Sequence, residues 1–206
     1  MNTQEQAQLS AADRETYRKA AEAGNPDAQY HVGMTYANAN GVELDYKQAF
    51  KWIYLAAEVG HVQAMRTLAW LYANGFGTEQ SDEKAQHTSV LLAEKGNPKD
   101  QYFLASLYQS GIYGMQPDSE KMIHWYYQAA QQHYARAQYA LAKIILKGVD
   151  IKANDEMAFQ WLSLANMNGH KKAADELAKL IKRVPKEKIE EYKVRMTESI
   201  KSSLQQ

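Results

Sequence analysis

The chain has 206 residues and no cysteine, so it can form neither disulfide bridges nor a reactive thiolate. Only 4 prolines and 11 glycines interrupt it, which argues against long disordered tracts. No apolar run approaches the roughly 18 residues that a membrane-spanning helix needs. Neither charge sign is in excess, because 24 Lys and Arg residues balance 24 Asp and Glu residues. This balance removes the usual electrostatic basis for binding nucleic acid or an anionic membrane.

The first residues, 1–6, are polar and do not resemble an export signal. We therefore expect a cytoplasmic protein. A chain from which an export signal had been removed would have the same sequence features.

A two-residue repeat motif recurs along the chain at spacings of 36, 36, 37 and 36 residues, and a turn precedes each copy. A constant period in this range is typical of repeat arrays, in which each unit buries its apolar face against its neighbours. The copies are Ala28-Gln29, Ala64-Met65, Asp100-Gln101, Ala137-Gln138 and Ala173-Ala174.

Each repeat is predicted to contain two helices. Apolar residues of the first helix recur with helical spacing around a small residue, at Gly33, Ala69, Ala105, Ala142 and Ala178. A glycine inside a helix costs about 1 kcal/mol relative to alanine, so we expect another helix to press against Gly33. A loop containing glycine follows, and the second helix begins after a capping residue, which is Asp45, Ser81, Asp118 or Asn154.

The residues of the first repeat carry a family resemblance. They read Ala28-Gln29-x-x-Val32-Gly33-x-x-Tyr36, then Asn40-Gly41-Val42 with Asp45, then Ala49-x-x-Trp52 with Ala56-Ala57-Glu58-x-Gly60-His61. This pattern resembles the Sel1-like repeat, which is related to the tetratricopeptide repeat, and the match extends over about residues 11–177. The resemblance implies an all-α fold, a right-handed α-α superhelix (solenoid) of antiparallel helix pairs. Thr88 in place of Trp and His133 in place of the turn Gly depart from the pattern.

For the domain organisation, we expect a polar tail over residues 1–10 and a single solenoid over residues 11–184. The solenoid would contain a capping helix at 11–24, four full repeats at about 25–169 and a partial fifth repeat at 170–184. Residues 185–206 are predicted to form a C-terminal capping helix, which brings the total to about 11 helices. Its apolar stripe is Ile189, Tyr192, Met196 and Ile200. An amphipathic partner-binding helix is the alternative interpretation of this last segment.

One short motif suggests catalysis, because Ser81-Asp82-Glu83-Lys84 matches the Ser-x-x-Lys pattern of serine penicillin-recognising enzymes. That chemistry also needs a Lys-Thr-Gly motif, which the sequence lacks, and the repeat register places Ser81 at a helix cap. The histidines do not have metal-ligand spacing, and no glycine-rich phosphate-binding motif occurs. We therefore expect no enzymatic activity, catalytic residue, cofactor or metal.

In tetratricopeptide-like arrays the first helix of each pair lines a concave face. By this analogy, the small-residue slot serves as a register mark and predicts the positions that line a partner-binding groove. They are Tyr30, Met34, Asn38, Arg66, Trp70, Asn74, Tyr102, Ser106, Gln109, Tyr139, Lys143 and Lys147. Tyr, Trp, Met and Arg are enriched at interfaces, although some of these aromatic residues could instead pack between repeats. Lys143 and Lys147 would attract acidic side chains or a terminal carboxylate.

The leading functional hypothesis is a non-enzymatic scaffold or adaptor that binds a protein or peptide in this groove. Resemblance to the Sel1-like family implies roles in complex assembly, in regulation, or in bacterial envelope and host-interaction systems. Two alternatives stay open, namely an immunity protein for a cognate secreted toxin and a hydrolase of β-lactam or peptidoglycan type.

Overall fold

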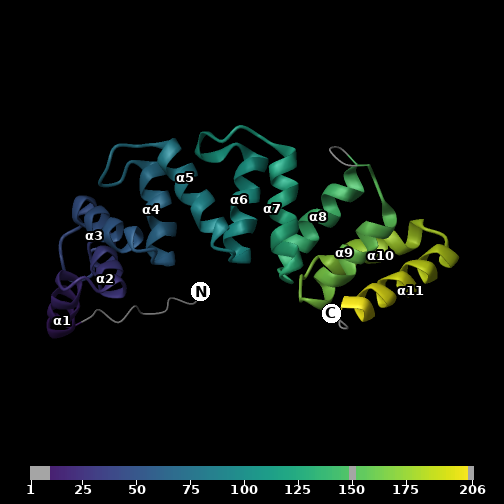
Figure 1. The fold of residues 1–206 in the computed structure, drawn as a ribbon, viewed down its shortest axis with the longest axis horizontal. Coiled ribbons are helices and arrows are strands. Elements are labelled where there is room, and N and C mark those ends of the chain that lie inside the picture. The colour runs from purple at the N-terminus through teal and green to yellow at the C-terminus, as the bar shows by residue number, and fades with distance from the viewer. Residues whose placement is uncertain (1–9, 149–151, 204–206) are drawn as a thin grey trace. The chain divides into compact units, whose positions relative to one another are not determined.

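The computed structural model of the protein describes residues 10–148 and 152–203 (Figure 1). These residues form an all-α solenoid of antiparallel helix pairs, as the repeat pattern predicts. The described residues contain eleven α-helices, one 3-10 turn and no strand: α1 (Ala11–Glu22), α2 (Pro26–Ala37), α3 (Tyr46–Glu58), α4 (Val62–Asn74), α5 (Asp82–Glu94), α6 (Pro98–Ser110), η1 (Ile112–Gly114), α7 (Ser119–Gln131), α8 (Ala135–Lys147), α9 (Asp155–Met167), α10 (Ala173–Arg183) and α11 (Lys186–Ser203). Residues 1–9 of the expected polar tail, Val149 and Asp150 of the fourth loop, and the side chain of Ile200 lie outside the described part.

The helices begin at the residues that the sequence predicts as caps. Ser10 and Asp13 form a capping box at α1, in which each side chain accepts a hydrogen bond from the backbone N–H of the other residue. The predicted caps of the second helices all accept backbone N–H groups of the following first turn. These are Asp45 at α3, Ser81 at α5, Asp118 at α7 and Asn154 at α9.

The residues of the repeat motif contact the helix that precedes each first helix. Its alanine is buried in four of the five copies, at Ala28, Ala64, Ala137 and Ala173. The glutamine reaches back over the turn, because Gln29 and Gln138 each donate a side-chain hydrogen bond to the carbonyl eight residues earlier, over 3.3 Å and 3.1 Å. In these two repeats the motif therefore joins consecutive helices by a hydrogen bond.

The small-residue slot marks where two helices press together. A Cβ atom on Gly33 would lie 2.5 Å from Ile53 Cγ1 of α3, which confirms the packing reason predicted for this glycine. Ala69, Ala105 and Ala142 are buried at the same slot.

The prediction for the fifth copy of this slot, Ala178, is wrong, because this residue is exposed and α10 buries Ala173 and Leu180 instead. The physical reason is that no second helix of a full repeat follows α10, so Leu180 and Val184 cluster with Ile189 of α11. In α11, Ile189 is buried, and Tyr192 and Met196 pack against the same cluster, as the capping stripe predicts.

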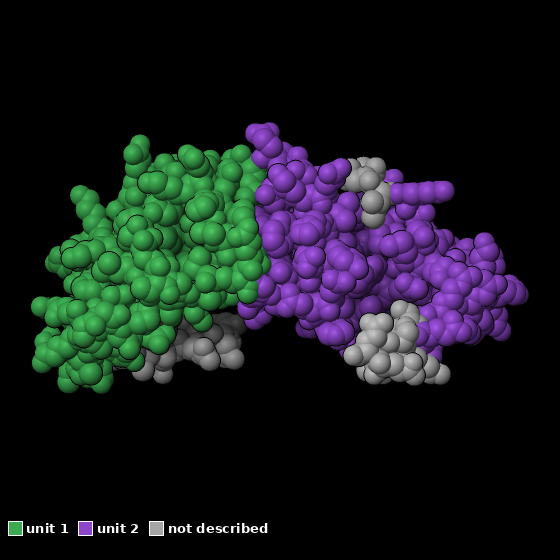
Figure 2. Space-filling model, in the orientation of Figure 1, with its two compact units in different colours: residues 1–95, 111–115 green, residues 96–110, 116–206 purple. Residues whose placement is uncertain are grey.

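The helices group into two compact units, coloured separately in Figure 2. Unit 1 comprises the chain up to Lys95 together with Gly111–Met115, and its core lies around α3 and α4. Unit 2 comprises Gly96–Ser110 and the chain from Gln116, with one apolar cluster around α7 and α8 and another around α9, α10 and α11. A single array over residues 11–184 would require a particular placement of the two units relative to one another, so this array stays a prediction.

His133, which replaces the turn glycine of the other repeats, has a backbone φ of +61°. A left-handed conformation costs a non-glycine residue roughly 1–2 kcal/mol, of which the greater flexibility of unfolded glycine offsets about 0.5–1 kcal/mol. We therefore expect His133→Gly to stabilise the protein by about 0.5–1 kcal/mol in urea denaturation followed by circular dichroism. His124→Gly, an exposed histidine within α7, is the matched control and should lose about 1 kcal/mol. Changes of the same sign in both variants would contradict the interpretation.

Candidate functional site

The predicted groove positions of unit 1 lie on α2 and α4 and at the end of α2. Tyr30 and Met34 are half-buried and pack against the core cluster of the unit. For Tyr30 this contact agrees with the alternative in which some of the aromatic residues pack between repeats. Arg66 is half-buried, and Asn38, the C-cap residue of α2, is exposed. The Asn74 side-chain amide donates to the Trp70 carbonyl over 2.8 Å, so this N–H group serves its own helix.

Trp70 is the most exposed aromatic residue among these unit 1 positions, with 41% of its surface accessible. Its ring lies 4.9 Å from that of Phe76, which in turn stacks on Tyr46 at 4.6 Å. The turn after α4 therefore holds an exposed indole ring in a fixed position. Large aromatic side chains presented in this way contribute strongly to protein interfaces.

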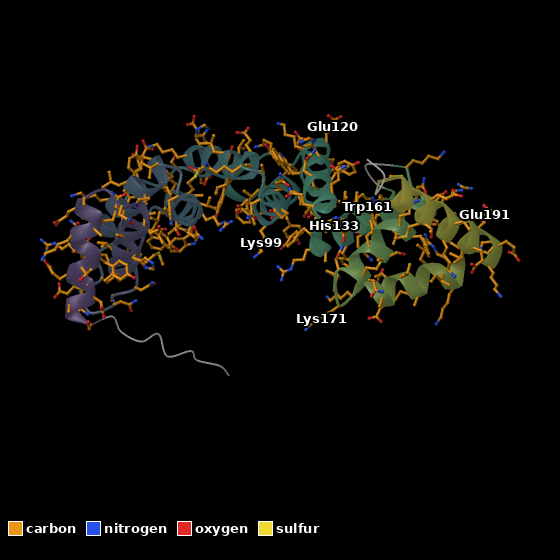
Figure 3. The ribbon with its side chains drawn as sticks, turned by 60° about the horizontal axis from the view of Figure 1, so that its bottom comes forward. Lys99, Glu120, His133, Trp161, Lys171 and Glu191 are labelled. Carbon is orange, nitrogen blue, oxygen red and sulfur yellow. The ribbon has the colours of Figure 1, made fainter. Side chains whose placement is uncertain are left out.

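In unit 2 a cleft of about 840 Å³ opens along α8. Its walls come from α6, α7 and α8, from the turn between α7 and α8, and from the turn between α9 and α10; His133 and Lys171, one from each turn, are labelled in Figure 3. Five predicted groove residues line this cleft together: Tyr102, Gln109, Tyr139, Lys143 and Lys147. The sixth, Ser106, does not line it, and its hydroxyl donates to the Phe103 carbonyl of its own helix over 2.6 Å.

Tyrosine rings form the apolar part of the cleft wall. Tyr102 lies 5.3 Å from Tyr126 and 5.4 Å from Tyr134, measured between ring centroids. The Tyr126 hydroxyl donates to Gln109 Oε1 over 2.8 Å. Burial, with a smaller effect of Tyr102, raises the pKa of Tyr126 to about 12, so this hydroxyl stays protonated and polar at neutral pH.

The charged part of the cleft wall is cationic. The cations are Arg136, Lys143, Lys147, Lys171 and Lys172, and no acidic side chain among the described residues lines the cleft. Within the described residues Lys143 has an acidic partner, because its Nζ lies 2.7 Å from Glu176 Oε2. Hydrogen bonds from Lys143 and Lys179 lower the pKa of Glu176 to about 2, so this carboxylate stays charged.

His170 lies in the turn before α10 and lines the same cleft. Its ring stacks on Tyr139 with centroids 4.1 Å apart and an interplanar angle of 17°. Its Nδ1 atom is buried and has no hydrogen-bond partner among the described residues. Burial lowers the pKa of His170, and the positive charges of Arg136 and Lys172 lower it further, which favours the neutral ring.

The sequence analysis missed the cleft residues that come from turns, because it gave the turn positions of each repeat only a structural role. The charge at the position directly before the repeat motif nevertheless indicated some of these residues. That slot holds Asp27 and Gln63 in the first two repeats and a cation in the last three, at Lys99, Arg136 and Lys172. Reading this slot across the repeats would have identified two of the cleft cations.

The possible catalytic motif serves as a helix cap. Ser81 Oγ accepts the backbone N–H of Lys84 over 3.2 Å at the start of α5. His61 also caps a helix, because its Nδ1 accepts the backbone N–H of Ala64 over 3.1 Å. In the described part of the chain, no three His, Cys, Asp or Glu residues form a group that could hold a metal ion. None of the described helices is long and apolar enough to cross a membrane.

Comparison with known proteins identifies relatives of this arrangement. The protein-family model described as Sel1 repeat matches residues 17–25, 26–61, 62–87, 98–134 and 135–170. A Sel1 repeat protein from Oxalobacter formigenes is similar in structure, with a TM-score of 0.70 and 27% identity over 91% of this chain and 79% of its own. A protective antigen present in uropathogenic Escherichia coli strains, displaying an SLR fold, has a TM-score of 0.69 and 26% identity over 93% of this chain. The alignment covers 41% of that antigen, so the chain spans less than half of its length. No curated protein sequence matches the chain.

Proposed function

The chain belongs to the Sel1 repeat family, and on this basis we propose that it is a non-enzymatic scaffold or adaptor that holds a protein or peptide partner on its first helices. The partner would contact α2 and α4 in unit 1, and α6 and α8 in unit 2. The unit 2 cleft carries this proposal, because five positions selected from the repeat register by analogy with tetratricopeptide-like arrays line it together.

The composition of these surfaces supports a binding role. Unit 1 offers the Trp70 ring, held by Phe76 and still accessible, and unit 2 offers tyrosine and lysine side chains around a cleft. Aromatic anchors with a few polar partners are the typical content of an interface centre.

A binding role without catalysis agrees with the position of Ser81. Its hydroxyl oxygen caps α5, so the side chain that would act as nucleophile in a penicillin-recognising enzyme already satisfies a backbone group. The chain's Ser-x-x-Lys match is explained by helix capping.

We expect Trp70→Ala to weaken partner binding about tenfold or more, because truncating an aromatic anchor at an interface centre costs at least about 1–2 kcal/mol. The partner is first identified by quantitative affinity enrichment from the source cell with the wild-type protein. It is then purified, and its affinity for wild-type and variant proteins is measured by isothermal titration calorimetry.

Tyr127→Ala provides the matched control for this test. Tyr127 is 43% exposed, close to the 41% of Trp70, but it lies on the second helix of its pair. We expect its truncation to change the affinity less than about twofold. Equal affinities of wild-type and Trp70→Ala proteins, or a loss in Tyr127→Ala alone, would show that the partner does not use the first-helix face.

A further inference from the structure

One position of the repeat, which lies beside a histidine, carries opposite charges in the two units. In unit 1, Asp27 Oδ1 lies 3.0 Å from Nε2 of His61. Three repeat intervals of 36, 36 and 37 residues carry these two slots to Arg136 and His170 in unit 2. A carboxylate thus stands beside the first histidine, and a guanidinium occupies the corresponding position near the second.

Both histidines lie against a tyrosine of the same repeat position, although His61 Nδ1 caps α4 and His170 Nδ1 has no hydrogen-bond partner among the described residues. Tyr30 lies 5.0 Å from the ring of His61, and its repeat equivalent Tyr139 lies 4.1 Å from the ring of His170. Unit 1 therefore shows that this Tyr-His framework accommodates a carboxylate. In unit 2 no described acidic side chain takes that position in the cleft, although the site is surrounded by positive charge.

The cations extend along α8 farther than one carboxylate can reach. Arg136, Lys143 and Lys147 share one helix face with Tyr139, and Arg136 and Lys147 are eleven residues apart, which corresponds to about 16 Å of helix. An extended peptide covers that length with about five residues, at about 3.3 Å each. Lys171 and Lys172 add charge at the Arg136 end, and neither pairs with an acidic side chain in the part that the structure describes.

The aromatic residues of the cleft favour a peptide over a single-stranded nucleic acid. Nucleic-acid grooves present open aromatic faces on which bases stack. Here Tyr139 is stacked against His170, and Tyr102 packs against Tyr126 and Tyr134. The ring contacts that would be offered to bases are instead made within the protein.

We propose that the unit 2 cleft binds an extended acidic peptide segment through its Asp and Glu side chains, and that one of these carboxylates lies beside His170, as the Asp27 carboxylate lies beside His61. This proposal rests on the proposed binding function and names its partner chemistry. The positive cleft draws the segment in, and Arg136 and Lys147 at the two ends of α8 hold successive carboxylates, whereas Lys143 between them is paired with Glu176. Attraction of this kind weakens as salt screens the charges.

The test uses the full chain and a fluorescein-labelled peptide of alternating glutamate and glycine, amidated at its C-terminus, in a fluorescence polarisation titration. We expect the wild-type protein to bind this peptide and to lose affinity as the salt concentration rises. The corresponding glutamine peptide should bind at least about tenfold more weakly, because it lacks the charge. Equal binding of both peptides would overturn the proposal, as would tighter binding of an oligothymidylate of matched charge.

Arg136→Asp is the most informative variant, because it copies the Asp27–His61 pair that unit 1 already contains. We expect it to keep the helical circular dichroism spectrum and to weaken binding of the glutamate peptide at least about tenfold, since a resident carboxylate would occupy the site. Unchanged affinity in a folded Arg136→Asp protein would overturn the proposal.

A second pair of variants tests the cleft without changing α8. Lys171→Glu combined with Lys172→Glu should weaken binding similarly, whereas Lys186→Glu combined with Lys188→Glu makes the same change of charge at exposed residues outside the cleft. We expect the control to stay within about twofold of the wild type. Equal losses in both double variants would mean that net charge, and not the cleft, attracts the peptide.

The outcome of the peptide-binding test can be distinguished from the outcome of the Trp70→Ala test of the proposed function. If the glutamate peptide fails to bind while the purified partner still depends on Trp70, only the acidic-peptide proposal is wrong. If neither the peptide nor the partner responds to changes on the first-helix face, both proposals are wrong.

Discussion

Gly77→Ala is expected to destabilise the protein by about 3 kcal/mol or more. Gly77 has a φ of +72°, which strains any residue with a side chain, and a Cβ atom there would overlap the backbone carbonyl of Tyr46 at the start of α3. The conformational strain contributes about 1–3 kcal/mol, and the forced displacement of packed backbone contributes a similar amount. Because neither group is the end of a flexible side chain, the clash cannot be relieved by a rotamer change. The measurement is urea denaturation followed by circular dichroism.

Gly96→Ala separates the two contributions to this loss. Gly96 has a φ of +88°, but a Cβ atom there would meet no atom within 4 Å. Its replacement should therefore cost only the conformational strain less the entropy that unfolded glycine has in excess of alanine, a net of about 0.5–1 kcal/mol. Equal losses in the Gly77 and Gly96 variants would contradict the close approach of the turn after α4 to the start of α3.

Ile53→Ala is expected to lose about 2–4 kcal/mol. Ile53 has no exposed surface and fills the space between α3 and the Gly33 position of α2. Truncating a fully buried isoleucine removes its apolar burial and leaves a cavity where the surroundings relax only in part. Denaturation midpoints and slopes of the wild type and the variant provide the measurement.

A double-mutant cycle with Gly33→Ala tests that contact directly. In the wild-type background the new methyl group would meet Ile53 Cγ1 at 2.5 Å, so we expect a loss of about 1–3 kcal/mol in spite of the better helix propensity of alanine. In the Ile53→Ala background this clash is absent, and the loss should be smaller by about 1 kcal/mol or more. Additive losses would mean that the two residues do not press on each other.

The helix starts and the repeat register were predictable because they depend on local chemistry. Asp45, Ser81, Asp118 and Asn154 cap their own helices, and a cap bonds to residues two or three positions away. Gly33 was recognisable in the same way, since a glycine within a regular helix pattern needs a packing partner. The prediction was wrong at Ala178, because the burial of α10 depends on α11, which does not belong to a repeat.

The candidate site was predictable only in part. The register identified five residues that line the unit 2 cleft, yet it also included Ser106, which bonds within its own helix, and Met34, which packs on the core. It did not identify the cleft residues in turns, such as His170 and Lys171. A repeat register states which positions are equivalent, whereas exposure depends on the neighbouring side chains.

By itself, the sequence determined the period, the helix starts, four of the five small-residue contacts and the membership of a repeat family, because these follow from short-range hydrogen bonds and from a pattern repeated along the chain. Only the tertiary structure decided where positively charged side chains surround a cleft. The cleft of unit 2 joins residues from Tyr102 to Lys172, and its positive wall exists because Arg136 and Lys147 of α8 line the same cleft as Lys171 and Lys172 of the turn before α10. The physical reason is that a binding surface is made by side chains far apart in the chain, and their mutual distances are set by how the helices pack.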